Sequence, residues 1–496
     1  MDRQDGCEWR GIDSAYRKVK KASQLYDGKN FELSLEEIEA ALEISPVDAF
    51  WHFSKALILD SLYRYDEAIE EYQLVLELDP NDLETLNSLG TDFTRTGQYD
   101  LALKAFEQAQ EIDPQDEKSF CNRIILYGEM ENLDSAEQMF YLAQQINPDC
   151  SLCFYNLGVI LFAKKEYQKA IYCWLRTAEI DPECPKINYY LANAYWLNGD
   201  KIKAQEYFLK ELQLDSGNIG AIFNLGLVLL ALGKIESAED KFNRILELMP
   251  SFTPALFYLG EIALHDKDYN KAEDLYKQAL KQDNNMQATQ YRLACCSLVK
   301  GLKTEARIYL KSELRSSDLS DTFVLTSMGS MFLVCDDLGL ATHCLLRAID
   351  SDSSNADAYY HLGLIGVKKE EFKDAIEFLK HALNIRPGTT LFLQVLAVVY
   401  SMAGRLKEAE EIVKKLIQSE STPQLKKFKR KIWLAQGKNE FAQRFLLSKI
   451  EQKALNHVSS IIYEVCWYPG DDWPGYREAN FNIMNLFYVR KAEWRG

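Results

Sequence analysis

The sequence predicts an all-α protein in which antiparallel helix pairs stack into a solenoid. First, the chain of 496 residues repeats itself every 34 residues, and its early repeats end in a proline, as at Pro80, Pro114, Pro148 and Pro182. Proline cannot continue a helix, so each of these positions marks a helix stop. Second, small and bulky apolar residues recur at fixed distances from the stops. This spacing is typical of helices that bury one face against a neighbour.

The 34-residue period continues through Ser216, Pro250 and Asn284 without a slip. After one extra residue it resumes at Leu319 and continues to Pro387. The extra residue falls within segment 311–321, and we expect two sub-arrays to meet there. A fixed period over most of the chain favours one repeat architecture over several unrelated domains.

The second helix of each repeat is predicted around a small residue that lies twelve residues before the stop. It is Ser34 in the first unit and alanine in the others, namely Ala68, Ala102, Ala136, Ala170, Ala204, Ala238, Ala272, Ala306, Ala341, Ala375 and Ala409. One helical turn later follows a bulky apolar residue: Tyr72, Phe106, Phe140, Trp174, Phe208, Phe242, Tyr276, Leu310, Leu345, Leu379 and Val413. One face of this helix is therefore apolar and needs a neighbour to bury it.

The first helix of each repeat is predicted around a second small position, ten residues beyond each stop. Its members are Ala56, Gly90, Gly158, Ala192, Gly226, Gly260, Ala294, Gly329, Gly363 and Ala397, and Ile124 is the exception in the fourth unit. Small residues that face each other let two helices approach closely. Between the helices run short turn-prone strings around Gly97, Gly199 and Gly404, which predict αα-hairpins.

This pattern of Leu-Gly, aromatic, alanine, aromatic and terminal proline resembles the tetratricopeptide repeat. The resemblance covers about residues 15 to 421 as twelve units. It implies a right-handed superhelical α-solenoid whose concave groove is lined by the first helix of each pair. It also implies that each repeat buries its apolar face only against its neighbours.

The repeats divide the chain into five predicted segments. An N-terminal segment, 1–14, precedes repeats one to nine over 15–318 and repeats ten to twelve over 319–421. A degenerate helix pair follows over 422–453. The aromatic C-terminal tail, 454–496, carries Trp467 and Trp473, and we expect it to cap the last open repeat, because an uncapped solenoid end exposes apolar surface.

The charge balance argues against a nucleic-acid partner. The chain has 74 acidic and 57 basic residues, a net charge of −17, whereas binding to a phosphate backbone is driven by lysine and arginine. Its longest apolar stretch, 221–232, is interrupted by Asn224 and Gly226 and is too short to span a bilayer. We expect a cytoplasmic protein without membrane insertion, and its oligomeric state is left open.

The sequence gives no sign of an enzyme. The segments outside the repeats are together shorter than an ordinary catalytic domain of roughly 100 residues. No glycine-rich phosphate loop or His-Glu-x-x-His motif occurs, and the six histidines lie at unrelated repeat positions. We therefore expect neither catalytic residues nor a cofactor.

The 11 cysteines are scattered at irregular spacing, as small buried hydrophobes of a reducing compartment would be. We propose no disulfide framework from them. The one Cys-x-x-Cys is Cys150 to Cys153, at the junction between two repeats. A zinc site there would need further ligands, for which Cys121, Cys173 or Cys184 are the candidates. The favoured interpretation is a packing role, so no metal ligand is predicted.

The resemblance implies that the fifth, ninth and twelfth residues of each first helix face the groove. The fifth positions of five consecutive repeats are aromatic, and the eight predicted partner-binding residues are Tyr155, Tyr189, Asn193, Trp196, Phe223, Leu227, Phe257 and Tyr291. A continuous apolar strip favours a groove that binds a peptide or helix. The alternative, that each of these residues packs on the adjacent repeat, stays open.

Two known binding modes of the family are disfavoured. A clamp for a terminal carboxylate needs lysine and asparagine at the fifth and ninth positions, and only Asn193 matches. An asparagine ladder that holds a peptide backbone would occupy the sixth positions, which are Asn122, Asn156 and Asn224 but also Tyr190, Tyr258 and Arg292. The broken ladder favours recognition by side-chain pockets.

The sequence thus predicts a non-catalytic adaptor or scaffold that holds one or more protein or peptide partners in its groove. The alternative is an accessory or regulatory subunit that presents substrate to a separate enzyme, such as a glycosyltransferase.

Overall fold

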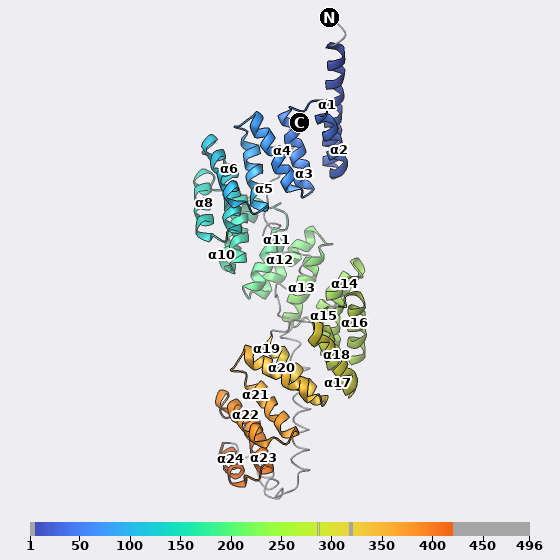
Figure 1. The fold of residues 1–496 in the computed structure, drawn as a ribbon, viewed down its shortest axis with the longest axis vertical. Coiled ribbons are helices and arrows are strands. Elements are labelled where there is room, and N and C mark those ends of the chain that lie inside the picture. Colours follow the sequence, from blue (N-terminus) through green and yellow to red (C-terminus); the bar gives the residue numbers. More distant parts are fainter. Residues whose placement is uncertain (1–4, 285, 287, 317–320, 420–496) are drawn as a thin grey trace. The chain divides into compact units, whose positions relative to one another are not determined.

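The structure is a computed structural model that describes residues 5–284, 286, 288–316 and 321–419 (Figure 1). Within these residues it contains twenty-four α-helices and no strand. They form two compact units, one up to Val228 and the other from Leu229 on. The predicted helix pair 422–453 and the predicted capping tail 454–496 lie outside the described residues.

The first unit contains twelve helices and the first part of a thirteenth. They are α1 (Asp5–Asp27), α2 (Phe31–Leu42), α3 (Ala49–Ser61), α4 (Tyr65–Leu78), α5 (Leu83–Arg95), α6 (Tyr99–Ile112), α7 (Glu117–Glu129), α8 (Leu133–Ile146), α9 (Ser151–Ala163), α10 (Tyr167–Ile180), α11 (Ile187–Leu197), α12 (Lys201–Leu214) and α13 (Ile219–Ala231). Helix α1 begins ten residues before the predicted start of the first repeat at 15.

The second unit contains the end of α13 and the remaining described helices. They are α14 (Ile235–Leu248), α15 (Thr253–His265), α16 (Tyr269–Gln282), α17 (Thr289–Val299), α18 (Lys303–Ser316), α19 (Thr322–Val334), α20 (Leu338–Ser351), α21 (Ala356–Lys368), α22 (Phe372–Ile385), α23 (Thr390–Met402) and α24 (Leu406–Ser419).

Helices follow the predicted pairing in both units. From α1 to α12, and again from α15 to α24, each odd-numbered helix packs along the even-numbered helix that follows, and each pair packs on the next. Helices α4, α6, α8 and α10 end two residues before the prolines that mark the predicted stops. The predicted all-α solenoid of antiparallel helix pairs is confirmed.

The packing inside a pair depends on the small residues that the period picks out. Ser34 and all eleven alanines of the second helices have no exposed surface. A Cβ atom on Gly158 would come within 2.5 Å of Trp174 Nε1, and one on Gly260 within 2.5 Å of Tyr276 Cε1. Glycine therefore makes room for the aromatic ring of the second helix, and the predicted close approach is confirmed.

The two departures from the pattern have local explanations. Ser34 is fully buried, but its hydroxyl donates a hydrogen bond of 2.7 Å to the carbonyl oxygen of Ala22, so no polar group is left unsatisfied. Ile124 is fully buried in the place where other repeats have a small residue. In that repeat the ring of Phe140 packs edge-on against Phe154 of the next pair, with ring centroids 5.0 Å apart.

Each of the twelve turns inside the described helix pairs contains one residue in the left-handed conformation. These residues have φ between 55° and 88°, and they are Lys29, Tyr63, Gly97, Glu131, Lys165, Gly199, Gly233, Lys267, Gly301, Asp336, Glu370 and Gly404. Only glycine adopts this conformation without a steric penalty, yet the chain uses it here in five of the twelve turns. The turns therefore share a left-handed residue at the same repeat position, although the type of that residue varies.

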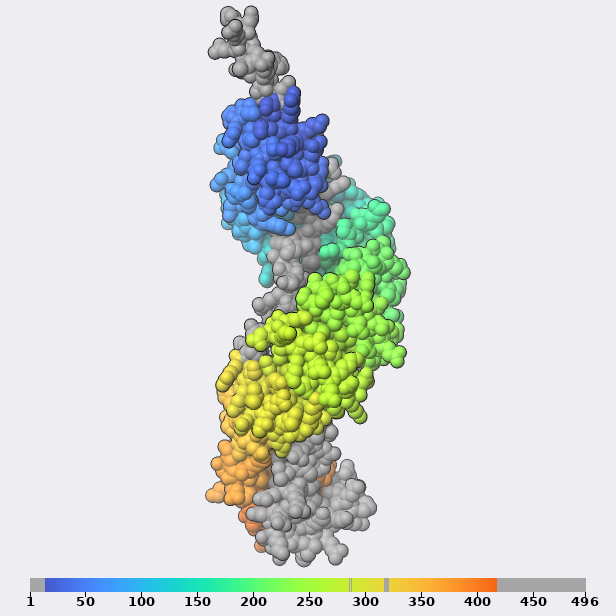
Figure 2. All heavy atoms as spheres, turned by 90° about the vertical axis from the view of Figure 1, so that its right-hand side faces the viewer, coloured from blue at the N-terminus to red at the C-terminus, as the bar shows by residue number. Residues whose placement is uncertain are grey.

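First helices and second helices occupy different positions in the stack. The first helices α5, α7 and α9 contact one another directly, as do α19 and α21. Among the described helices, no two successive second helices make a comparable contact. First helices are therefore the more closely spaced row at these places, and Figure 2 shows the atoms of successive helix pairs in chain order within each unit.

Candidate functional site

The predicted groove residues come from five first helices. In the first unit, Tyr155 lies on α9, three residues lie on α11 (Tyr189, Asn193 and Trp196), and two lie on α13 (Phe223 and Leu227). In the second unit, Phe257 lies on α15 and Tyr291 on α17. Tyr155, Asn193, Phe223, Phe257 and Tyr291 are buried, whereas Tyr189, Trp196 and Leu227 are only half-buried.

Helices α11 and α13 meet through a small polar network. The Asn224 amide donates to Asn193 Oδ1 at 2.9 Å and to the Tyr189 hydroxyl oxygen at 3.4 Å. The Asn193 amide donates to the carbonyl oxygen of Tyr189 at 2.9 Å. Burial raises the pKa of the Tyr189 phenol, so this hydroxyl stays neutral. The network holds Tyr189 between two repeats, with its hydroxyl 3.3 Å from where a Cβ on Gly220 would lie.

The structure thus brings Tyr189 and Asn193 together with one residue that was not predicted to bind. In the sequence, Asn224 is only a member of the broken asparagine ladder. Its place at the sixth position of the first helix is the feature that could have added it to the predicted site. Asn156, at the same position of α9, is fully buried, and its amide has no hydrogen-bond partner among the described residues.

The predicted residues of the second unit are buried in the packing. The ring of Phe257 has no exposed surface and lies against Tyr258 and Tyr276, with ring centroids 5.5 and 5.6 Å away. Tyr291 is 3% exposed. Phe257 and Tyr291 are packing residues in this conformation, and their part in binding stays a prediction.

Arg292 has a different reason for interrupting the ladder. Its guanidinium group donates to Glu261 Oε2 at 2.6 Å, and neither side chain is more than 2% exposed. The Tyr276 hydroxyl donates to the other oxygen of Glu261, which places three repeat helices, α15, α16 and α17, around one carboxylate. Burial raises the pKa of Tyr276 well above its usual range, and the charge of Glu261 adds to that effect.

Comparison with protein families identifies the repeat. Models described as tetratricopeptide repeat match residues 19–82, 83–116, 158–199, 223–288, 336–389 and 367–432, which together make up more than half of the chain. The chain belongs to the tetratricopeptide repeat family. This fold is generally a non-catalytic scaffold for protein interactions, and the matches support a protein-binding tetratricopeptide repeat scaffold.

Solved structures of tetratricopeptide repeat proteins resemble the chain at low identity. One from Parabacteroides merdae is 17% identical with a TM-score of 0.38, and the match covers 48% of this chain and 94% of the other. Yeast Tom70 is 16% identical with a TM-score of 0.37, over 83% and 98% of the two chains. Pseudomonas aeruginosa PilF is 19% identical with a TM-score of 0.34, over 42% and 96%. No curated protein matches the chain.

Among the described residues of this tetratricopeptide repeat protein, no helix has the length and apolarity needed to cross a membrane.

A buried carboxyl group, Asp92, lies beside a second carboxyl group, Asp60, where the second and third tetratricopeptide repeats meet. Asp92 on α5 is 1% exposed and accepts a 3.0 Å hydrogen bond from Arg95, which also pairs with Asp60 on α3. Burial raises the pKa of Asp92 to about 8, and the nearby charge of Asp60 contributes to the rise. Burial therefore favours the protonated form of Asp92.

This shift predicts how stability depends on pH. The folded state keeps the proton of Asp92 up to a pKa of about 8, whereas the unfolded state loses it at a pKa near 3.9. The free energy of unfolding therefore falls progressively as the pH rises from 4 through 8. Asp92→Asn should remove that dependence. Between pH 5 and pH 9 its free energy of unfolding should therefore increase relative to that of wild type by more than about 1 kcal/mol. Denaturant unfolding at pH 5, 7 and 9 measures the gain.

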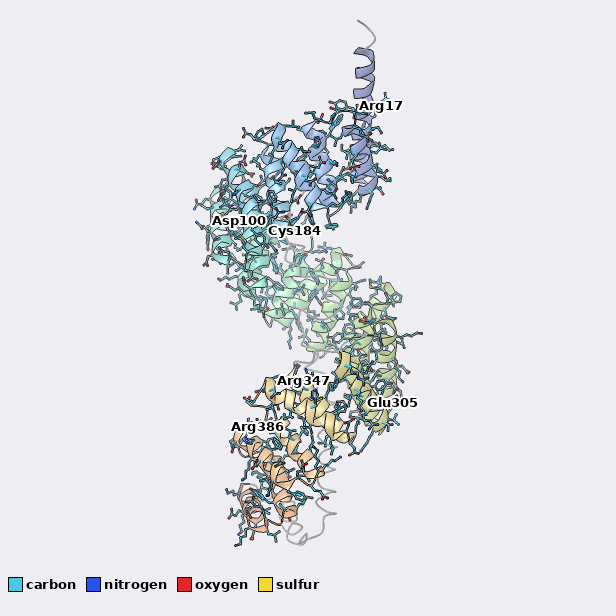
Figure 3. The ribbon with its side chains drawn as sticks, viewed as in Figure 1. Arg17, Asp100, Cys184, Glu305, Arg347 and Arg386 are labelled. Atoms are coloured by element: carbon cyan, nitrogen blue, oxygen red, sulfur yellow. A yellow bond between two sulfur atoms is a disulfide. The ribbon has the colours of Figure 1, made fainter. Side chains whose placement is uncertain are left out.

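The control is Asp100→Asn, which removes an exposed carboxylate on the neighbouring helix α6 (Figure 3). Because this carboxylate is exposed, its removal should change the free energy of unfolding by no more than about 0.5 kcal/mol at each pH. If the difference between Asp92→Asn and wild type did not change with pH, Asp92 would be ionised in the folded protein.

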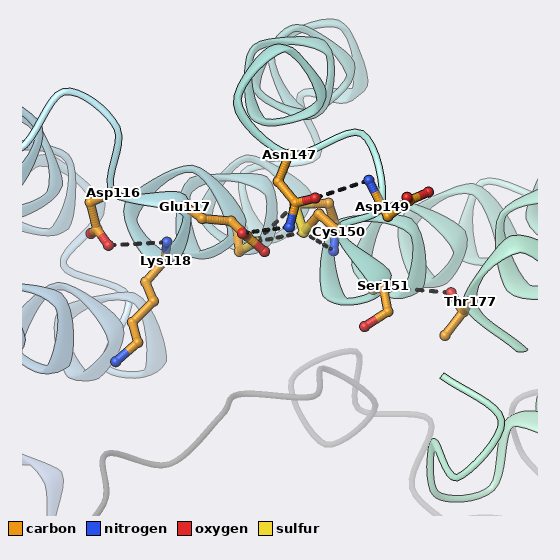
Figure 4. Close-up of a disulfide and its surroundings, with 10 residues drawn as sticks. Asp116, Glu117, Lys118, Asn147, Asp149, Cys150, Ser151 and Thr177 are labelled. Carbon is orange, nitrogen blue, oxygen red and sulfur yellow. Dashed lines mark hydrogen bonds between the residues drawn. A yellow bond between two sulfur atoms is a disulfide. The ribbon is translucent and has the colours of Figure 1, made fainter. Parts of the chain in front are cut away.

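The cysteines differ from the prediction in one respect. The structure has a disulfide between Cys150 and Cys153, where none was proposed, because the Cys-x-x-Cys spans the first turn of α9 and brings both sulfurs to one side (Figure 4). Cys121 lies beside them, whereas Cys173 and Cys184, the other candidate ligands, are not part of the group. Cys184 lies in the segment before α11 (Figure 3). Glu117, which was not predicted, joins the group.

Proposed function

We propose that this tetratricopeptide repeat protein is a non-catalytic scaffold that binds a partner peptide or helix on the first helices α11 and α13. The supporting observation is the surface around the Tyr189–Asn193–Asn224 network. There, Tyr189, Trp196 and Leu227 keep part of their apolar surface exposed, on helices that the network fastens together.

The chemistry of this surface fits a partner that offers apolar side chains. Half-buried aromatic residues on a rigid element provide contact area at low cost in conformational entropy, which is why tyrosine and tryptophan dominate binding hot spots. The Asn193–Asn224 pair supplies polar groups between them. With a net charge of −17, the protein favours partners that are not strongly acidic. A cytoplasmic location remains the expectation from the sequence.

The test is binding by the full chain of peptides selected from a random peptide library displayed on phage. We expect wild type to yield apolar peptides, and the variant Tyr189→Ala/Trp196→Ala/Leu227→Ala to bind those peptides at least about tenfold more weakly, because hot-spot residues carry most of the binding energy. Binding is measured by isothermal titration calorimetry, and circular dichroism checks that helical content is unchanged.

The matched control removes exposed aromatic surface from second helices. Tyr141 on α8 and Tyr172 on α10 are 60% and 61% exposed. The variant Tyr141→Ala/Tyr172→Ala should bind the selected peptides as wild type does. If this control lost affinity while the triple variant kept it, the binding surface would lie on the second helices and the proposal would be wrong.

A further inference from the structure

At the junction of the fourth and fifth repeats, three cysteine sulfurs and a carboxylate converge. Cys121 and Glu117 lie one turn apart on α7, Cys150 is the N-cap of α9, and Cys153 lies in its first turn. One potential ligand atom from each of the four lies within 4.8 Å of the other three. Cys121 Sγ is 2.9 Å from Cys153 Sγ and 3.5 Å from Cys150 Sγ. The three cysteines are at most 1% exposed.

The preceding repeat carries a different group of side chains at the corresponding positions. One period of 34 residues earlier stand Asn87, Asp116 and Ser119, which hydrogen-bond to one another across the junction of the third and fourth repeats. The Asn87 amide donates to Asp116 at 2.8 Å, and the Ser119 hydroxyl donates to Asn87 at 3.0 Å and to Asp116 at 2.6 Å. A hydrogen-bonded polar triad therefore joins those two repeats.

Replacing all three members of such a triad by cysteine sacrifices its hydrogen bonds. A thiol is a weak donor and a weak acceptor, and cysteine is not among the residues preferred at an N-cap, where Asp116 stands in the preceding repeat. Three unrelated packing cysteines would have no reason to fall on these three contacting positions. A ligand that the three sulfurs share would give the junction the cross-link that the polar triad supplies elsewhere.

We propose that, in the reduced protein, Cys121, Cys150, Cys153 and Glu117 bind one Zn²⁺ ion. Thiolates are the ligands that favour zinc, and four protein ligands in a closed arrangement are typical of structural zinc sites. Zinc–sulfur bonds of about 2.3 Å in a tetrahedron place the sulfurs roughly 3.8 Å apart. Cys121 Sγ would have to move from Cys153 Sγ by less than about 1 Å.

Groups around the site are arranged to support its negative charge. The backbone N–H of Cys153 donates to Cys150 Sγ at 3.1 Å, and the Asn147 amide donates to Glu117 Oε2 at 2.8 Å (Figure 4). Glu117 and Cys150 lie at the N-termini of α7 and α9, where the helix dipole favours anionic side chains. The amide of Asn147 also orients the carboxylate, as groups around a metal site commonly do.

Zinc and the disulfide exclude each other. Tris(2-carboxyethyl)phosphine reduces the Cys150–Cys153 bond by two electrons, each sulfur takes up a proton, and the phosphine becomes its oxide with an oxygen atom from water. Each of the three thiols then releases its proton to the buffer as it binds the cation. The oxidised chain keeps only Cys121 and Glu117 as ligands, which are too few for a closed site.

The experiment titrates Co²⁺ into the reduced, metal-free full chain, because tetrahedral thiolate–cobalt complexes absorb in the near ultraviolet and visible. We expect one equivalent of Co²⁺ to produce these bands and one equivalent of Zn²⁺ to abolish them. Cys121→Ser and Glu117→Gln should each weaken binding at least about tenfold. Cys173→Ser and Cys184→Ser, which remove buried thiols outside the group, should bind as wild type does.

A second variant guards against loss of the fold. Cys121→Asn/Cys150→Asp/Cys153→Ser installs the triad of the preceding repeat, which the chain already folds around at Asn87, Asp116 and Ser119. It should fold, bind no cobalt and show no rise in melting temperature with zinc, whereas the melting temperature of reduced wild type rises. The proposal is overturned if reduced wild type gives no cobalt–thiolate bands, or if Cys121→Ser gives the same bands with the same affinity.

Discussion

Replacing Trp174 with alanine should lower the free energy of unfolding by about 3 to 5 kcal/mol, the range for truncating a buried tryptophan. Trp174 is fully buried on α10, and its indole N–H donates a 3.1 Å hydrogen bond to the carbonyl oxygen of Tyr155. Its ring fills the space over Gly158, and its ring centroid lies 5.4 Å from that of Phe162 and 5.6 Å from that of Tyr190. The substitution leaves a cavity at the centre of one repeat and at its contact with the next.

Chemical denaturation followed by circular dichroism measures this loss. Hydrogen exchange locates it, since amides of α9 to α11 should exchange faster than those of α1 to α4. The control is Tyr172→Ala on the same helix, because Tyr172 is 61% exposed and should change stability by no more than about 0.5 kcal/mol. Equal effects of the two substitutions would mean that Trp174 is not the packing centre of its repeat.

Arg292→Met should destabilise the second unit by about 3 to 5 kcal/mol, because it leaves the carboxylate of Glu261 buried without its cation. The Tyr276 hydroxyl still donates to Glu261, but a neutral donor does not balance the charge. The double variant Arg292→Met/Glu261→Met should recover most of the loss, since replacing both members of a buried ion pair by apolar residues is often neutral or stabilising.

An exposed ion pair serves as the control. Lys271 and Glu239 lie 2.8 Å apart with 51% and 32% of their side chains exposed, so Lys271→Met should change stability by less than about 1 kcal/mol. Denaturant midpoints of the three variants and wild type give the comparison. If the double variant were as unstable as Arg292→Met alone, the loss would come from the volume of the arginine and not from the unpaired charge.

The fold was predictable because its packing rule is local and repeated. Ala204 and Phe208 occupy the same two repeat positions as Ala170 and Trp174, and all four side chains are fully buried in the structure. Where a repeat departs from this pattern, the sequence shows which position differs but not which interaction compensates for the change. The hydrogen bond from Ser34 to Ala22 depends on how two helices face each other, which no single position reveals.

The site was less predictable because exposure is decided between repeats. Phe257 and Tyr189 occupy the same position of their repeats, yet one is fully buried and the other is half-buried. The Glu261–Arg292 pair joins residues 31 positions apart with no local motif. The cysteine cluster was partly predictable, because Cys121, Cys150 and Cys153 lie at positions where adjacent repeats make contact. Glu117 was not predicted, because it joins the cluster only through its place at the start of α7.

The shared turn conformation bears on how an array of this kind can change its length. Since all twelve turns have a residue with the same backbone conformation, a gene rearrangement that joins the first half of one hairpin to the second half of another leaves the chain path intact. It adds or removes residues in whole multiples of 34 wherever both turns lie in the unbroken part of the period. Such a junction also places the first helix of one repeat against the second helix of another, so a glycine such as Gly158 must meet a new ring in place of Trp174. Recombination at the turns is therefore limited by the packing of the two helices that it joins, and not by the residue that each turn carries.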